Sequence, residues 1–88
     1  MPEVDYLGRR IGFDWVKCWT GKADEFAVVC DVYVDGKLSA DVRYDNSHIP
    51  PSQQESLGAE AVGVSLQEFR QMLESTRPAE SAMRKGMF

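Results

Sequence analysis

The sequence predicts an α+β fold, in which a three- or four-stranded antiparallel sheet is followed by two C-terminal helices packed on one face. Two observations predict it: apolar and polar residues alternate around an Asp-Gly pair in residues 26–45, and helix start signals follow the prolines at 50 and 51. The chain has 88 residues, of which 43% are hydrophobic. This length suits one small domain, which we place at residues 1–77.

The N-terminal part is expected to form two strands, over about residues 3–7 and 10–20. Bulky side chains recur at alternate positions of the second segment: Ile11, Phe13, Trp15 and Trp19. Aromatic residues at a period of two favour a strand. We expect these side chains to face the core because of their bulk, although a shift of one residue would turn all of them to the other face.

Residues 25–34 and 38–45 are expected to pair as a hairpin around Asp35 and Gly36. A two-residue loop would place Val32 on the same face as charged Asp41, so we expect a three-residue loop with Gly36 in the left-handed conformation. In that register one face is largely apolar: Val28, Cys30, Val32, Val34, Leu38, Ala40, Val42 and Tyr44. We expect the helices to cover this face and to leave the opposite face open.

Two helices are expected, over about residues 53–62 and 66–76. Two Ser-x-x-Glu pairs have the spacing of a capping box: Ser52 with Glu55, and Ser65 with Glu68. In a capping box the two side chains bond backbone amides that have no partner inside the helix. Val64 and Phe69 have the spacing of a hydrophobic staple, which makes the second start signal the stronger one.

The remaining segment, residues 78–88, has neither a helical period nor a cap. We expect a flexible C-terminal tail, which is the usual state of a chain terminus without docking contacts. Its apolar residues Met83, Met87 and Phe88 would suit a docking arm as an alternative.

Acidic residues are concentrated in the middle of the chain. The net charge is −4, and residues 23–60 carry eight acidic groups against two basic ones. A surface of this sign attracts basic protein surfaces and repels phosphate backbones. The open face of the hairpin would present the candidate partner-binding residues: Asp31, Tyr33, Asp41, Arg43 and Asp45.

The sequence contains no pattern that indicates catalysis. His48 is the only histidine, and the two cysteines, Cys18 and Cys30, are too far apart for a C-x-x-C pair or a zinc site of the usual spacing. A nucleophile built from Cys30, His48 and Asp45 would need an exposed thiol, whereas the hairpin register turns Cys30 inward. The aspartates lack the spacing of a calcium loop. We therefore expect no catalytic residue, no metal and no cofactor.

No secretory signal is evident, and no apolar stretch approaches the ~20 residues that a membrane helix needs. The low cysteine content favours a reducing compartment, so we expect a cytoplasmic protein without membrane contact. A homodimer would be compatible with the apolar content.

Residues 57–73, LGAEAVGVSLQEFRQML, resemble a helix-turn-helix motif, with Ala59 at the small position of the first helix and Gly63 in the turn. The resemblance implies a DNA-binding regulator. Its second helix would present four residues to the major groove: Ser65, Gln67, Arg70 and Gln71. Because this segment carries more acidic than basic side chains, we take DNA binding as the alternative interpretation.

The sequence therefore predicts a small acidic, non-catalytic protein-binding module. We expect an inhibitor or adaptor that occludes a basic site, for example a nucleic-acid-binding site, on a larger complex. Its size and acidity are similar to those of small phage-encoded antagonists of host defence systems, without a motif that ties it to a family. Nucleic acid is a partner only under the helix-turn-helix interpretation.

Overall fold

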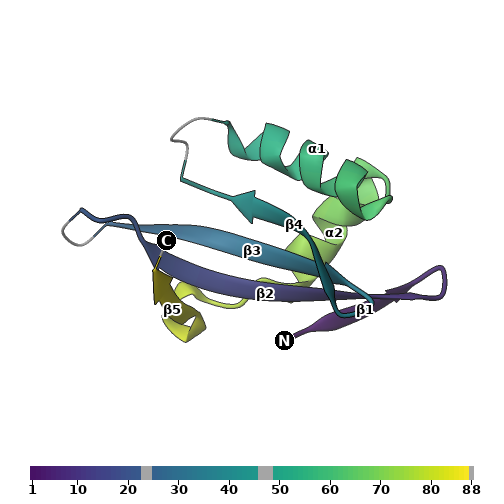
Figure 1. Cartoon of the computed structure of the whole chain (residues 1–88), viewed down its shortest axis with the longest axis horizontal. Coiled ribbons are helices and arrows are strands. Elements are labelled where there is room, and N and C mark those ends of the chain that lie inside the picture. Colours follow the sequence, from purple (N-terminus) through teal and green to yellow (C-terminus); the bar gives the residue numbers. More distant parts are fainter. Residues whose placement is uncertain (23–24, 46–48, 88) are drawn as a thin grey trace.

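A computed structural model describes residues 1–22, 25–45 and 49–87. In chain order the elements are β1 (Glu3–Tyr6), β2 (Arg9–Trp19), β3 (Phe26–Val34), β4 (Lys37–Arg43), α1 (Pro51–Val62), α2 (Leu66–Thr76), a 3₁₀ turn (Glu80–Ala82) and β5 (Arg84–Met87). Strands β1 to β4 are neighbours in chain order and antiparallel, and β5 pairs with β2 in parallel (Figure 1). The predicted α+β class, an antiparallel sheet followed by two helices, is confirmed.

The core lies between one face of the sheet and the two helices. Phe13 of β2 and Phe69 of α2 are both fully buried, and their ring centroids are 6.4 Å apart. Apolar side chains from β3, β4 and both helices complete the core: Val28, Cys30, Val32, Val42, Ala59, Val62, Met72 and Leu73. The aliphatic face of the hairpin is therefore the covered face, as its alternating pattern predicts.

The start of α2 follows the sequence prediction. The Ser65 hydroxyl accepts a hydrogen bond from the Glu68 backbone amide at 3.2 Å, so this capping interaction is confirmed. Between the helices, Gly63 adopts a φ of 82°, and its amide donates to the carbonyl of Ala59. A left-handed glycine of this kind ends α1 and turns the chain into α2. The guanidinium of Arg9 adds a bond to the Val62 carbonyl at 2.7 Å.

The capping box predicted at Ser52 and Glu55 is wrong. Helix α1 begins at Pro51, its cap position is Pro50, and no side chain bonds a backbone amide there. Proline suits the first helical position because it has no amide hydrogen to leave without a partner. Ser52 therefore lies inside the helix, and the predicted start at about residue 53 is two residues late.

The three-residue loop predicted for the hairpin is also wrong. Asp35 and Gly36 form a two-residue loop in which both have positive φ, 50° and 82°, as a type I′ turn requires. The ladder then shifts by one residue, because Val32 pairs with Ala40 while Tyr33 pairs with Leu38. With this bulge, the two-residue loop gives the same apolar pairing beyond Tyr33 that a three-residue loop would give. Leu38 is the exception, since it pairs with Tyr33 and is 50% exposed.

The C-terminal segment is ordered, contrary to the predicted flexible tail. Strand β1 pairs with β2 only up to Gly12, and this leaves the same edge of β2 open further along. Strand β5 fills that edge beside Val16 to Trp19, and the side chain of Met83 is buried in the core. Backbone hydrogen bonds to an open edge explain this order, and they leave no pattern in the sequence. Phe88 lies outside the described residues.

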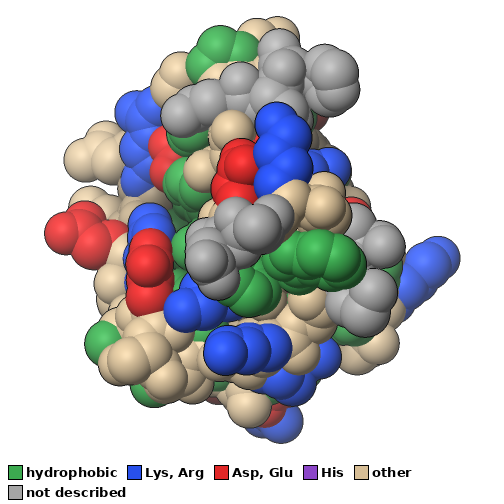
Figure 2. All heavy atoms as spheres, turned by 90° about the vertical axis from the view of Figure 1, so that its left-hand side faces the viewer, with side chains coloured by type: hydrophobic (Ala, Val, Ile, Leu, Met, Phe, Trp, Pro, Cys, Tyr) green, Lys and Arg blue, Asp and Glu red, His purple; other side chains and the backbone are tan. Residues whose placement is uncertain are grey.

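The expectation that the aromatic residues of β2 face the core is correct for two of the three. Phe13 is fully buried and Trp15 is 5% exposed, whereas Trp19 is 39% exposed. Trp19 pairs with Phe26 at the end of the sheet where β2 leads into β3. Figure 2 views the molecule from this end, where Lys and Arg side chains gather around hydrophobic ones.

Candidate interaction site on the open face of the sheet

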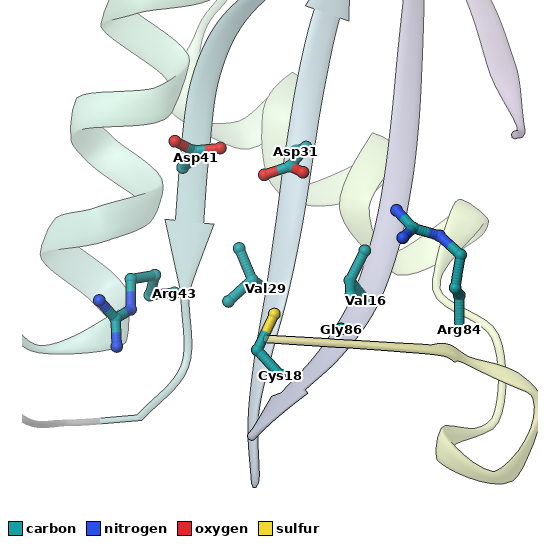
Figure 3. Close-up of a pocket in the computed structure, with 8 residues that line it drawn as sticks. All are labelled: Val16, Cys18, Val29, Asp31, Asp41, Arg43, Arg84 and Gly86. Atoms are coloured by element: carbon teal, nitrogen blue, oxygen red, sulfur yellow. The ribbon is translucent and has the colours of Figure 1, made fainter. Parts of the chain in front are cut away.

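The helix-free face carries a pair of aspartates on neighbouring strands. Asp31 of β3 and Asp41 of β4 occupy directly paired positions in the ladder. Their side chains point to the open face because Val32 and Val42, the next residues along the two strands, point into the core. The two carboxyl groups lie side by side in Figure 3.

A third carboxylate extends this row across the sheet. Asp14 of β2 is paired with Asp31 on the side opposite Asp41. Asp14 accepts a hydrogen bond from Arg84 of β5, with 2.7 Å between Nη2 and Oδ2. Among the described residues, no salt bridge joins Asp31 or Asp41 to a basic side chain. The two outer carboxylates of the row therefore differ in their partners. Asp14 forms a salt bridge with Arg84, whereas Asp41 forms none with a described basic side chain.

Repulsion and burial change the proton affinity of this pair. Partial burial raises the pKa of Asp31 to about 7, and a hydrogen bond that the protonated Asp31 carboxyl donates to Asp41, together with the charges of Asp41 and Asp14, acts in the same direction. Near neutral pH the pair accordingly holds one proton for part of the time. Directly opposed like charges weaken a sheet, so this arrangement does not stabilise the fold by itself.

The aspartates line one side of a hollow of about 410 Å³ in the open face (Figure 3). The hollow is lined by residues of four strands: Val16, Cys18, Val29, Asp31, Asp41, Arg43, Arg84 and Gly86. Its apolar part is a small cluster separate from the main core, formed by the buried side chains of Val16, Cys18 and Val29. The hollow therefore combines an apolar floor with carboxylates at its edge.

Strand β5 closes the hollow on the side of β2. Gly86 pairs with Cys18, and a Cβ at Gly86 would lie 3.1 Å from a Val16 methyl carbon, so the strand approaches the floor closely. Arg84, at the start of β5, extends along the edge of β2 in Figure 3. The C-terminal segment thus supplies both a wall and a cation to the hollow.

Three of the five predicted partner-binding residues meet at this hollow, namely Asp31, Asp41 and Arg43. Arg43 forms a salt bridge with Asp45, and in Figure 3 its side chain extends away from Asp31. Tyr33 lies on the same face, half-buried, opposite Gly12 of β2 and outside the hollow. Sequence reasoning thus placed these side chains on one face without resolving which of them come together.

Sequence reasoning missed two polar residues of this site, Asp14 and Arg84. The alternation of β2 contains the signal for Asp14, because a residue between buried Phe13 and Trp15 must point to the other face. That inference required the face of the aromatic residues to be known. No sequence pattern indicates that Arg84 belongs to the site, because its position depends on the pairing of β5 with β2.

Neither described cysteine has the surroundings of a nucleophile. Cys30 is fully buried, and burial raises the pKa of its thiol. Cys18 belongs to the floor of the hollow, where burial also raises its thiol pKa. The two thiols are free and lie on opposite faces of the sheet, and His48 lies outside the described residues. In the part of the chain described, no group of three or more His, Cys, Asp or Glu side chains is arranged to hold a metal ion.

The residues of the helix-turn-helix interpretation are all exposed: Ser65, Gln67, Arg70 and Gln71. Two of them already serve within the fold, since Ser65 caps α2 and the Arg70 guanidinium contacts Glu55 at 3.1 Å. Tyr44 also donates a hydrogen bond to Glu55, at 3.2 Å. A phosphate backbone would have to compete with this carboxylate for Arg70.

Comparison with models of known protein families, with curated proteins and with solved structures finds no match. Within the described residues, no helix combines the length and the apolar composition that crossing a bilayer requires. The fold and the hollow define a small α+β domain whose sheet is covered on one face and carries a carboxylate-edged depression on the other. Its function has to be argued from that depression.

Proposed function

We propose that this protein is a non-catalytic binding module that receives a basic segment of a protein partner on the open face of its sheet. One observation carries the proposal: Asp31 and Asp41 are opposed on an accessible face, where they repel each other. A lysine or arginine from a partner would relieve this repulsion and replace the shared proton. The pair is therefore better suited to recognition than to stability.

The shape of the hollow supports the same partner chemistry. Lys and Arg side chains have an apolar stem and a charged end, and the stem packs on apolar surface while the end seeks a carboxylate. Here the floor of Val16 and Val29 suits the stem, and Asp31 with Asp41 suits the charged end. Occlusion of a basic surface on a larger complex, as an inhibitor or adaptor would do, is the role we propose for this chemistry.

Binding of a short arginine-rich peptide, measured by titration calorimetry, tests the proposal. We expect the double variant Asp31→Asn/Asp41→Asn to bind about tenfold more weakly than the parent protein. The matched control is Glu60→Gln/Glu68→Gln, which removes the same charge from exposed positions on the helices. Equal weakening in the two double variants would reject the hollow as the site and leave only non-specific attraction.

A second measurement separates this role from DNA binding by the helix pair. Duplex DNA should bind with a steep salt dependence, and binding should weaken in Gln71→Ala, if α2 enters the major groove. Under our proposal Gln71→Ala binds the arginine-rich peptide as tightly as the parent protein does.

A further inference from the structure

Two exposed aromatic side chains lie at the end of the sheet that the helices do not cover. Trp19 is the last residue of β2 and Phe26 is the first residue of β3, and the two are directly paired in the ladder. Each is 39% exposed, whereas the aromatic residues nearer the helices, Phe13 and Trp15, are buried. The sheet thus continues beyond its helical cover and presents aromatic rings to solvent.

Two lysine ammonium groups lie against one of these rings, that of Phe26. The ammonium groups of Lys17 and Lys85 lie 5.5 Å and 5.8 Å from the centroid of the Phe26 ring, in the range of cation–π contacts. They come from adjacent strands, because Lys17 of β2 pairs with Lys85 of β5. A third, Lys22, follows in the connection, where its carbonyl accepts a hydrogen bond from the Trp19 indole at 2.7 Å. Three of the four lysines of an acidic chain therefore gather at this end.

The same combination continues toward the helices. The guanidinium of Arg77, just after α2, lies 5.3 Å from the Trp15 ring centroid and 5.2 Å from that of Tyr44. Arg77 also pairs weakly with Glu80, at 4.0 Å. Cations thus contact aromatic rings at two places in this part of the molecule, at Phe26 and at Trp15 with Tyr44.

We infer that this end of the sheet, formed by Trp19, Phe26, Lys17, Lys22 and Lys85, is a second interaction surface that binds single-stranded nucleic acid. Single strands are bound without sequence preference by cations that contact phosphates and by aromatic rings on which bases stack. Both groups are present here within one patch. The lysines would exchange their contacts with the Phe26 ring for phosphates and would free the ring for a base.

Two other anionic partners fit the patch less well. An acidic peptide would use the lysines but has no flat bases to stack on Trp19 and Phe26. Duplex DNA keeps the faces of its bases inside the stack, so the exposed rings would gain nothing from it. This surface differs from the carboxylate hollow, and the inference does not depend on the proposed function.

Fluorescence anisotropy of a labelled oligothymidylate of about 12 nucleotides tests the inference with the full chain. We expect measurable binding at low salt that weakens about tenfold or more in Lys17→Gln/Lys85→Gln, with a salt slope smaller by about 1.4. Trp19→Leu should weaken binding about tenfold, and Trp19→Phe should retain most of it because the ring is kept. The matched control, Arg10→Gln/Lys37→Gln, removes two exposed cations outside the patch and should bind like the parent.

Three results would overturn the inference. The first is no binding by the parent protein at low salt, and the second is equal weakening by the control variant. The third is a loss that depends on the lysines but is the same for Trp19→Leu and Trp19→Phe, with polyglutamate competing as well as the oligonucleotide. That third result would assign the surface to an acidic protein partner. Circular dichroism of each variant establishes that a loss of binding is not a loss of fold.

Discussion

Asp31 and Asp41 stand directly opposite each other on β3 and β4, on the face of the sheet that the helices leave open. This relationship has a consequence for stability. Because the pKa of Asp31 is raised to about 7, the folded protein holds a proton between pH 4 and 7 that the unfolded chain has released. The contribution of this group to stability therefore falls as the pH rises through that window.

The variant Asp31→Asn should remove this dependence, because an amide resembles the protonated carboxyl group and carries no charge. As the pH rises from about 5 to about 8, we expect the free energy of unfolding of the variant to increase relative to that of the parent protein. The expected change is on the order of 1 kcal/mol, because solvent screens a partly exposed carboxyl group. Urea unfolding at the two pH values measures the difference. Asp5→Asn, at an exposed position on β1, should show no such change, and a gain that is the same at both pH values would contradict the prediction.

The two Ser-x-x-Glu pairs should respond differently to removal of their serine. Ser65→Ala loses the hydroxyl that accepts the Glu68 amide hydrogen bond, and we expect a loss of about 1 kcal/mol in the free energy of unfolding. Ser52→Ala removes no cap, because α1 begins at Pro51, and should change stability by less than about 0.5 kcal/mol. Denaturant unfolding of the two variants under one condition gives the comparison. Equal losses would indicate that Ser52 also caps its helix.

Gly58 should resist substitution by alanine, although it lies inside a helix. A Cβ at this position would lie 2.9 Å from a Phe69 ring carbon and 3.1 Å from a Val42 methyl carbon. Alanine gains about 1 kcal/mol in helix propensity, but overpacking a core costs about 1–3 kcal/mol. We expect Gly58→Ala to lower the melting temperature, whereas Gln53→Ala, at an exposed position of α1, should not lower it. A more stable Gly58→Ala variant would mean that Phe69 moves aside freely.

The C-terminal segment should contribute to stability through Met83. This side chain is 7% exposed and belongs to the main core, so Met83→Ala should cost about 2 kcal/mol. Leu57→Ala, which truncates a half-exposed side chain on α1, should cost much less. Thermal unfolding followed by circular dichroism measures both. A Met83→Ala variant as stable as the parent would support the flexible tail that the sequence predicts.

Local chemistry in the sequence determined much of this fold. Alternation in residues 26–34 was enough to assign Val28, Cys30 and Val32 to the covered face, because side chains on a strand point to its two faces in turn. The start of α2 could be predicted in the same way, because the Ser65 hydroxyl accepts a hydrogen bond from the backbone amide of Glu68, three residues later. In both cases the interacting groups are close in sequence, so the pattern carries the information.

Contacts between distant segments decided the rest. The bulge opposite Tyr33 reconciles a two-residue turn with the apolar register, and the turn alone does not reveal it. From the sequence alone, Gly58 lowers the helix propensity of α1. The structure gives its reason, because Phe69 and Val42 leave no room for a side chain there.

The candidate site shows the same division. The sequence by itself determined that Asp31 and Asp41 share an open face, because both follow from the period of one hairpin. Only the tertiary structure placed Asp14 beside Asp31 and brought Arg84 to the edge of the hollow. Arg84 is 70 residues from Asp14 in the chain, and β5 reaches β2 through backbone hydrogen bonds. Such bonds are available to almost any sequence, and for that reason they leave no recognisable pattern in this one.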